Sequence, residues 1–222
     1  MAGPEESLRI DTVKGPVSAK VARPRSPFAT IVVAHGAGAG MDHPFLVGFA
    51  RACLEEGLAT MRFNFPYVEA GRRSPDPEGV LRDAWRAAFE SASARRKAEP
   101  VWAGGKSLGG RIASMCAADG EIDPGGLVFL GYPLHPPGKP ERVRDEHLYR
   151  VEAPMLFLQG TSDPFASPTL LHRVVEKLGG RATLVPFEGG GHSFEVRGRK
   201  RDPRDIGASL APHVATFLRE HR

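Results

Sequence analysis

Two hydrophobic patterns alternate along this chain, and each predicts a different kind of element. Short apolar runs without polar alternation are typical of strands buried on both faces. Between them, apolar residues recur every three or four positions, as on one face of an amphipathic helix. Strands that alternate with helices predict a doubly wound α/β sheet. The strands, most of them of buried composition, are predicted over 30–34, 59–65, 101–103, 126–131, 154–159 and 182–186, and the helices over 45–56, 76–96, 112–119, 170–178 and 206–218.

The start of the chain follows a different pattern. Residues 7–13 and 17–21 alternate apolar and polar positions around Gly15-Pro16, which predicts two half-exposed antiparallel strands. We therefore expect a mostly parallel sheet of about seven strands in a single domain, residues 1–222. The proline-rich segment 66–79 is expected to be a surface loop. The connection 132–153 is too short for a large helical lid.

Composition excludes several classes of protein. An apolar content of 41% with 25% charged residues is typical of a globular protein, and a net charge of +4 is far from the signature of a nucleic-acid binder. No apolar run reaches the ~20 residues that span a bilayer, and Glu5 and Glu6 precede no apolar leader, so we expect a cytoplasmic protein without a membrane partner. Cys53 and Cys116 are expected to be buried, reduced thiols, and no metal or cofactor is predicted.

The segment around Ser107 carries the first candidate for chemistry. Gly105, Ser107 and Gly109 form the pattern G-x-S-x-G between a predicted strand and a predicted helix. In such a turn serine is exposed at a sharp bend, and the free N–H groups of the helix start lie beside its oxygen. Alone the pattern is modest evidence, because Gly and Ser are common in turns. It predicts a nucleophilic serine with the N–H of Leu108 as one oxyanion donor.

Two further candidates follow other strands. Asp163 comes directly after the strand 154–159, and His192 follows 182–186. Because the carboxyl ends of parallel strands meet in one crevice, Ser107, Asp163 and His192 are expected to lie together. His192 would take the serine proton as general base, and Asp163 would orient the imidazole. Asp76 and Asp83 are rival acids, but neither follows a strand in the right place.

A glycine-rich loop, residues 35–40, follows the strand 30–34. Its G-x-G-x-G spacing differs from the G-x-G-x-x-G of dinucleotide sites, so nucleotide binding is disfavoured. The better interpretation is a loop whose N–H groups, at Ala37 or Gly38, complete an oxyanion hole. His35 is expected to support this loop, while the remaining histidines fit surface positions.

These motifs resemble the α/β-hydrolase superfamily over nearly the whole chain. The chain order Ser, Asp, His is the one expected for that fold. Within it the chain resembles the dienelactone-hydrolase-like branch and, more narrowly, the small KANL/Tex-type hydrolase-like family. The resemblance implies the fold and a triad of Ser107, Asp163 and His192. Dienelactone hydrolases use cysteine as nucleophile, so their substrate is not carried over. The matching stretches are 35–38, 62–66, 104–110, 131–135, 159–165 and 192–194.

The substrate is less constrained than the reaction. Lys106 and Arg62 lie at the expected catalytic end of the sheet, where they could bind an anionic ester, although solvated or structural charges are the simpler interpretation. The sequence predicts a serine hydrolase, of the carboxylesterase or thioesterase kind, that acts on a small ester or acyl substrate as a monomer or homodimer. A hydrolase-fold binding or scaffold protein and a short-peptide hydrolase remain as alternatives.

Overall fold

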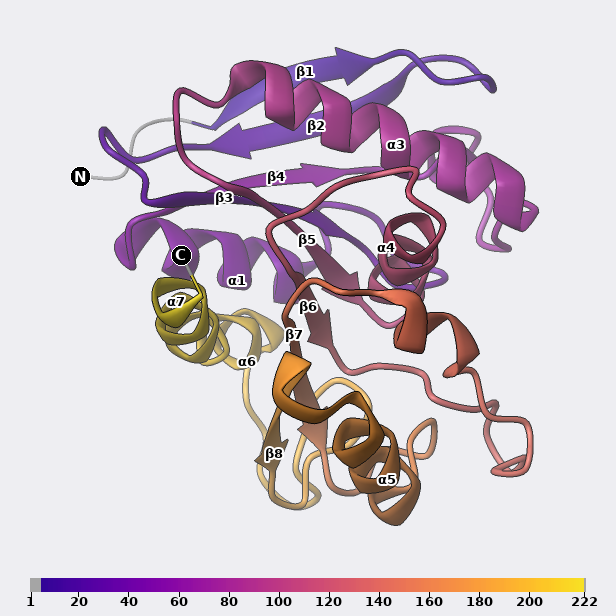
Figure 1. Ribbon diagram of the computed structural model, residues 1–222. Helices are drawn as coiled ribbons and strands as arrows, with labels where there is room; N and C mark the ends of the chain where they lie inside the picture. Colours follow the sequence, from indigo (N-terminus) through magenta and orange to yellow (C-terminus); the bar gives the residue numbers. More distant parts are fainter. Residues whose placement is uncertain (1–4, 222) are drawn as a thin grey trace.

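An eight-stranded sheet runs through the computed structural model, which describes residues 5–221 (Figure 1). The first two strands form an antiparallel hairpin, the second pairs antiparallel with its inner neighbour, and all other pairs are parallel. This confirms the predicted α/β sheet, with one strand more than expected because both hairpin strands join it. In spatial order the strands are β1 (Glu6–Ile10), β2 (Val17–Ala22), β4 (Leu58–Phe63), β3 (Ala29–Ala34), β5 (Val101–Lys106), β6 (Leu127–Leu130), β7 (Met155–Gly160) and β8 (Ala182–Phe187).

Helices cover both faces of the sheet. The helices α3, α4 and α5 pack on one face, and α1, α6 and α7 on the other, so each face has its own apolar core (Figure 1). The strands β3, β4, β5, β6 and β7 are buried at every position, as the runs of β3 and β6 predicted for those two strands. The helices are α1 (Pro44–Glu55), α2 (Pro66–Glu69), α3 (Glu78–Arg95), α4 (Leu108–Ala118), α5 (Pro168–Leu178), α6 (Pro203–Ala208) and α7 (Ala211–Glu220), with 3₁₀ turns η1 (Glu146–Arg150) and η2 (Gly179–Arg181).

Two local predictions were wrong. The segment expected as one helix over 206–218 is two helices, α6 and α7, separated at Ser209 and Leu210. Pro212 explains the break, because proline has no N–H for a helical bond and is tolerated only in a first turn, here that of α7. The expected loop 66–79 begins with the short helix α2, which has Pro66 at its first position.

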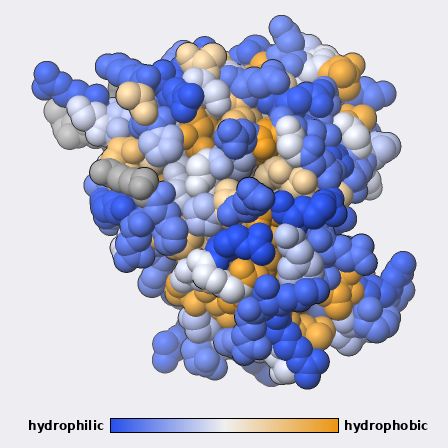
Figure 2. All heavy atoms as spheres, viewed as in Figure 1, coloured by the Kyte–Doolittle hydropathy of each residue, from blue (hydrophilic) through white to orange (hydrophobic). Residues whose placement is uncertain are grey.

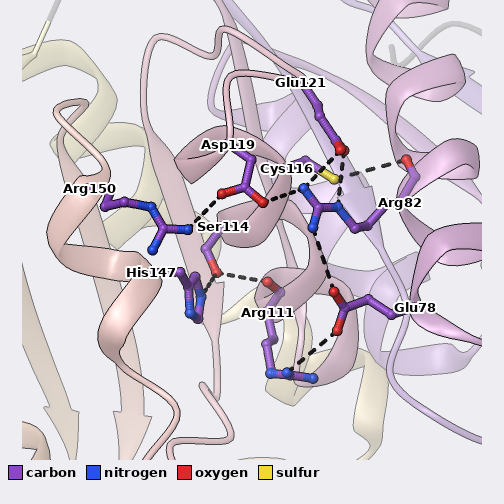
Figure 3. Close-up of polar contacts among 9 residues, drawn as sticks. All are labelled: Glu78, Arg82, Arg111, Ser114, Cys116, Asp119, Glu121, His147 and Arg150. Carbon is purple, nitrogen blue, oxygen red and sulfur yellow. Dashed lines mark hydrogen bonds and ion pairs between the residues drawn. The ribbon is translucent and has the colours of Figure 1, made fainter.

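The connection between β6 and β7 contains η1 and no other helix, so within the described residues no helical lid forms there, as predicted. A polar network fastens this connection to α3 and α4 (Figure 3). The guanidinium of Arg82 contacts the carboxylates of Asp119 and Glu121 at 2.6 and 2.8 Å, and Asp119 also pairs with Arg150 of η1 at 2.6 Å. Such partly exposed pairs contribute at most about 1 kcal/mol each, so we assign the network a positioning role.

Both cysteines are buried free thiols, as the sequence predicted. Burial raises the pKa of Cys53 well above its usual value and that of Cys116 to about 12. Neither thiol is therefore poised as a nucleophile.

The outer surface is dominated by polar side chains. Figure 2 shows hydrophilic residues over most of the face in view, with apolar residues scattered among them. Val13 is the one large apolar side chain that is strongly exposed within residues 5–221. No helix in that part of the chain has both the length and the apolar character needed to cross a membrane.

Candidate active site

Ser107 lies at the tight turn between β5 and α4, which we call the elbow. Its φ of 50° and ψ of −114° place a non-glycine residue in a strained conformation that costs roughly 1–3 kcal/mol. Strain of this size is retained where the surrounding structure enforces it, and here a buried strand and a packed helix fix both sides of the turn. The bend leaves the Ser107 side chain facing a cavity.

Three side chains predicted from the sequence form one hydrogen-bonded series. His192 lies 2.8 Å from Ser107, measured from Nε2 to Oγ, and its Nδ1 lies 2.7 Å from Oδ2 of Asp163. Asp163 follows β7 and His192 follows β8, so the sheet brings their loops together although they lie far from Ser107 in sequence. With Nδ1–H donating to the carboxylate, Nε2 is free to accept the serine proton.

The carboxylate of Asp163 is fully buried and saturated with donors. Its Oδ2 accepts a second hydrogen bond from Nε2 of Gln159 at 2.5 Å, and its Oδ1 accepts one from the Phe165 N–H at 2.8 Å. Gln159 is itself held, because its Oε1 accepts the N–H of Tyr132 at 2.7 Å. Sequence reasoning missed Gln159, although a polar residue at the end of the apolar run 155–158 was an available signal.

His135 corrects the expectation that the remaining histidines lie on the surface. Only 4% of it is exposed, and its Nε2 accepts the N–H of Ser167 at 2.9 Å. The backbone N–H of His135 also donates to the carbonyl of Phe165 at 2.9 Å. His135 therefore braces the loop that carries Asp163.

Buried side chains of the core support the glycine-rich loop after β3. His35 is completely buried, and its Nε2 accepts the N–H of Phe65 at 3.1 Å, so Nδ1 carries the proton and donates to the carbonyl of Gly36 at 2.8 Å. The hydroxyl of Tyr67 contacts the same carbonyl at 3.4 Å. In a trans peptide the C=O and the following N–H point in opposite directions, so the N–H of Ala37 is directed away from these supports. The predicted supporting role of His35 agrees with these contacts.

Burial of His35 gives the fold an acid sensitivity. Burial lowers its pKa from 6.5 to about 4, so between these values the unfolded chain binds more protons than the folded one. Stability is therefore complete above pH 6.5 and is lost as the pH falls toward 4. Between pH 7 and 4.5 this one group should reduce the free energy of unfolding by about 2–3 kcal/mol.

Urea unfolding at both pH values measures this loss. His35→Gln keeps a donor and an acceptor but takes up no proton, so the difference between pH 7 and 4.5 should shrink in the variant. His147 has a pKa lowered to about 4 for the same reason and contributes with the same sign in both proteins. An unchanged difference in His35→Gln would contradict the assignment.

A cavity of about 340 Å³ opens beside the Ser107 hydroxyl. Ala37, Gly38 and Lys106 line it together with Ser107 and His192, while Leu108 lies at the adjoining first position of α4. Apolar walls come from Phe45, Leu46 and Phe165. Within residues 5–221 no three His, Cys, Asp or Glu side chains are grouped as a metal site would require.

Arg62 is placed away from this cavity. It is 1% exposed on β4, where its Nη1 donates to the carbonyl of Met41 at 2.6 Å and its Nη2 pairs with the carboxylate of Glu5 at 2.5 Å. The structure therefore corrects the suggestion that Arg62 lines a substrate site, since its Nη1 and Nη2 are engaged by Met41 and Glu5.

Comparisons with known proteins identify the family and the fold. The model of the alpha/beta hydrolase domain family matches residues 27–218. The α/β serine hydrolase XC6422 of Xanthomonas campestris, described as lacking a lid, is 26% identical, with a TM-score of 0.75 over 96% of this chain and 95% of that one. Dienelactone hydrolase of Anabaena variabilis is similar in fold (19% identity, TM-score 0.75, 98% and 97% covered), as is the esterase domain of a Rhodothermus marinus protein (14%, 0.73, 98% and 99%). Because the family model covers most of the chain, the protein belongs to the alpha/beta hydrolase family.

Proposed function

We propose that the protein is a serine esterase or thioesterase that hydrolyses small acyl substrates through an acyl-enzyme on Ser107. The observation that carries the proposal is the unbroken hydrogen-bonded series from the Asp163 carboxylate through His192 to the Ser107 hydroxyl. A serine hydroxyl is a weak nucleophile at neutral pH, and a base held at 2.8 Å and oriented by a buried carboxylate is the arrangement that activates it.

The reaction would proceed in two halves. Oγ of Ser107 attacks the substrate carbonyl carbon as Nε2 of His192 takes the hydroxyl proton, and the carbonyl electrons move onto oxygen. When the tetrahedral intermediate collapses, the imidazolium gives that proton to the departing alcohol or thiol and the acyl-enzyme remains. Water then attacks the acyl carbon with His192 again as base, which releases the acid and restores Ser107.

Two N–H groups are suited to hold the developing oxyanion. Leu108 is the first residue of α4, so its N–H has no acceptor within the helix. Of the two loop candidates we favour Ala37, because its peptide is the one that the buried supports of the loop contact. Ala37 is held in orientation by the contacts of His35 and Tyr67 with the preceding carbonyl.

The cavity supports a small substrate. Its volume of about 340 Å³ is near the lower end of typical ligand sites, and Phe45, Leu46 and Phe165 form its apolar walls. The connection between β6 and β7 adds no helical lid within the described residues, so the site is open to a short acyl chain.

Labelling with a fluorophosphonate probe tests the proposal, because the probe reacts with activated serines. We expect the wild-type protein to be labelled, and Ser107→Ala and His192→Ala to lose labelling while remaining folded. Ser193 also lines the cavity but makes no hydrogen bond to His192, so Ser193→Ala should still be labelled. Folded wild-type protein without label, or label that persists in Ser107→Ala, would reject the proposal.

A further inference from the structure

Among the described residues that line the cavity, Lys106 carries a charge without a hydrogen-bonded partner. It is the last residue of β5, directly before Ser107, and only 9% of it is exposed. Its side chain lines the cavity, and its ammonium makes no hydrogen bond or ion pair with any of residues 5–221. An unpaired buried charge is costly, so a group of this kind is retained where something else supplies the partner.

The position of the Lys106 side chain puts its charge beside the reacting groups. A methyl group built on Gly36 would lie 3.6 Å from Cγ of Lys106, so the side chain starts beneath the glycine-rich loop. A methyl group built on Gly131 would lie 3.4 Å from Nζ of Lys106 and 3.8 Å from Cε1 of His192. The ammonium and the catalytic imidazole therefore lie next to the same glycine.

Neighbouring charges do not neutralise this ammonium. Burial lowers the pKa of Lys106 to about 8. The negative charges of Asp163 and Glu195 act in the other direction and raise this pKa, but they do not cancel the effect of burial. Asp163 already accepts three hydrogen bonds, and Glu195 is exposed and caps the N–H of Ser193. Because its pKa of about 8 lies above 7, Lys106 is still mainly protonated at pH 7.

The described lining of the cavity contains no carboxylate. Its titratable side chains are Lys106 and three imidazoles, those of His35, His43 and His192. His35 is neutral at pH 7, and burial with the charge of Lys106 lowers the pKa of His43 as well. A small substrate in this space thus meets one unpaired positive charge and no negative one.

We propose, on the basis of the esterase function above, that Lys106 binds a carboxylate carried by the substrate. The substrate class is then a short ester or thioester with a free carboxylate close to the scissile carbonyl. A carboxylate at Nζ would form a charge-assisted hydrogen bond and complete the missing ion pair. Neutral esters of the same shape fill the same walls but leave the ammonium unpartnered.

Matched ester pairs test this recognition. Monomethyl succinate carries its carboxylate on the acyl side, with methyl 4-methylpentanoate as its neutral match. Acetoxyacetate carries it on the alcohol side, with isobutyl acetate as its match. The readout is the ratio of kcat/KM for the anionic ester to that for its neutral match, measured by acid release.

We expect Lys106→Met to lower this ratio roughly 10- to 100-fold for at least one pair, mainly through a higher KM for the anionic ester. Lys106→Arg keeps the charge and should retain most of the preference, and Lys139→Met removes an exposed lysine elsewhere and should retain all of it. The preference should also fall as the pH rises through 8 in the wild type but not in Lys106→Arg. A ratio within about threefold of wild type in Lys106→Met for both pairs would overturn the proposal.

Binding without turnover separates this proposal from the esterase function. In Ser107→Ala the cavity remains but no acyl-enzyme forms, so ligand-observed NMR titrations report affinity alone. Monomethyl succinate or acetoxyacetate should bind Ser107→Ala more tightly than the Ser107→Ala, Lys106→Met double variant. If the wild-type protein hydrolyses no ester, this comparison still decides whether Lys106 recognises a carboxylate: equal binding by both variants would refute it.

Discussion

Asp163→Asn should lower kcat for ester hydrolysis by roughly 10⁴-fold while leaving the fold intact. The carboxylate accepts from His192 Nδ1 and Gln159 Nε2 through one oxygen. An asparagine amide can place its NH₂ group at the position of this oxygen. The NH₂ then faces the Nε2 donor of Gln159, and it donates to Nδ1 of His192, which must become an acceptor. The imidazole proton then moves to Nε2, which can no longer accept the proton of Ser107.

Rotation of the asparagine amide restores an acceptor for His192 only at the cost of another contact. Its NH₂ would then face the N–H of Phe165, which donates to Oδ1 at 2.8 Å in the native protein. Gln159 cannot turn its own amide without losing the N–H of Tyr132. Every arrangement therefore leaves one buried pair of donors facing each other.

Steady-state kinetics on a short-chain ester give the rate, and circular dichroism checks the fold. Asp83 is the matched control, because it is a carboxylate that the sequence offered as a rival acid but that binds the Val13 N–H and Arg86 outside the cavity. Asp83→Asn should retain kcat within about threefold. A kcat for Asp163→Asn within tenfold of wild type would contradict the role of Asp163.

The sequence predicted the fold and the grouping of Ser107, Asp163 and His192 for one reason. Apolar runs identify strands, and the carboxyl ends of parallel strands share one edge, so a residue that directly follows a strand is located before any contact is known. No such rule locates a residue within a strand or along a helix face. The interactions that were predicted are those that depend on strand order.

The interactions that were missed depend on particular pairs distant in sequence. Arg62 stands near the end of its strand, as a site residue would, but Glu5, 57 positions away, holds it. Gln159 was not recognised because its role exists only once Tyr132 and Asp163 lie on either side of it. Neither partner can be identified from local spacing.

At the elbow, the sequence motif predicts Gly109, but only the packing of the structure explains why a glycine is needed there. The motif requires a small residue there, but the reason is visible only in three dimensions: a Cβ on Gly109 would lie 2.4 Å from the carbonyl oxygen of Ala34 and 2.6 Å from its carbonyl carbon. These are backbone atoms of β3 in the middle of the sheet, so they cannot move as a flexible side chain would. The helix α4 therefore approaches β3 at a distance that only glycine permits.

Gly109→Ala should consequently destabilise the protein by at least about 3 kcal/mol, because relief of the overlap must separate α4 from β3. The same displacement would shift His35, the residue after Ala34, and with it the loop that presents Ala37, so activity should fall in the fraction that still folds.

Gly79→Ala is the matched control, since Gly79 lies in the first turn of α3 with open space at the Cβ position. This variant should be more stable than wild type by roughly 0.5 kcal/mol, because alanine is the better helix former. Urea unfolding of the two variants measures effects of opposite sign. A Gly109→Ala protein within about 1 kcal/mol of wild type would mean that α4 can retreat from the sheet without cost, and the strained turn at Ser107 would then need another explanation.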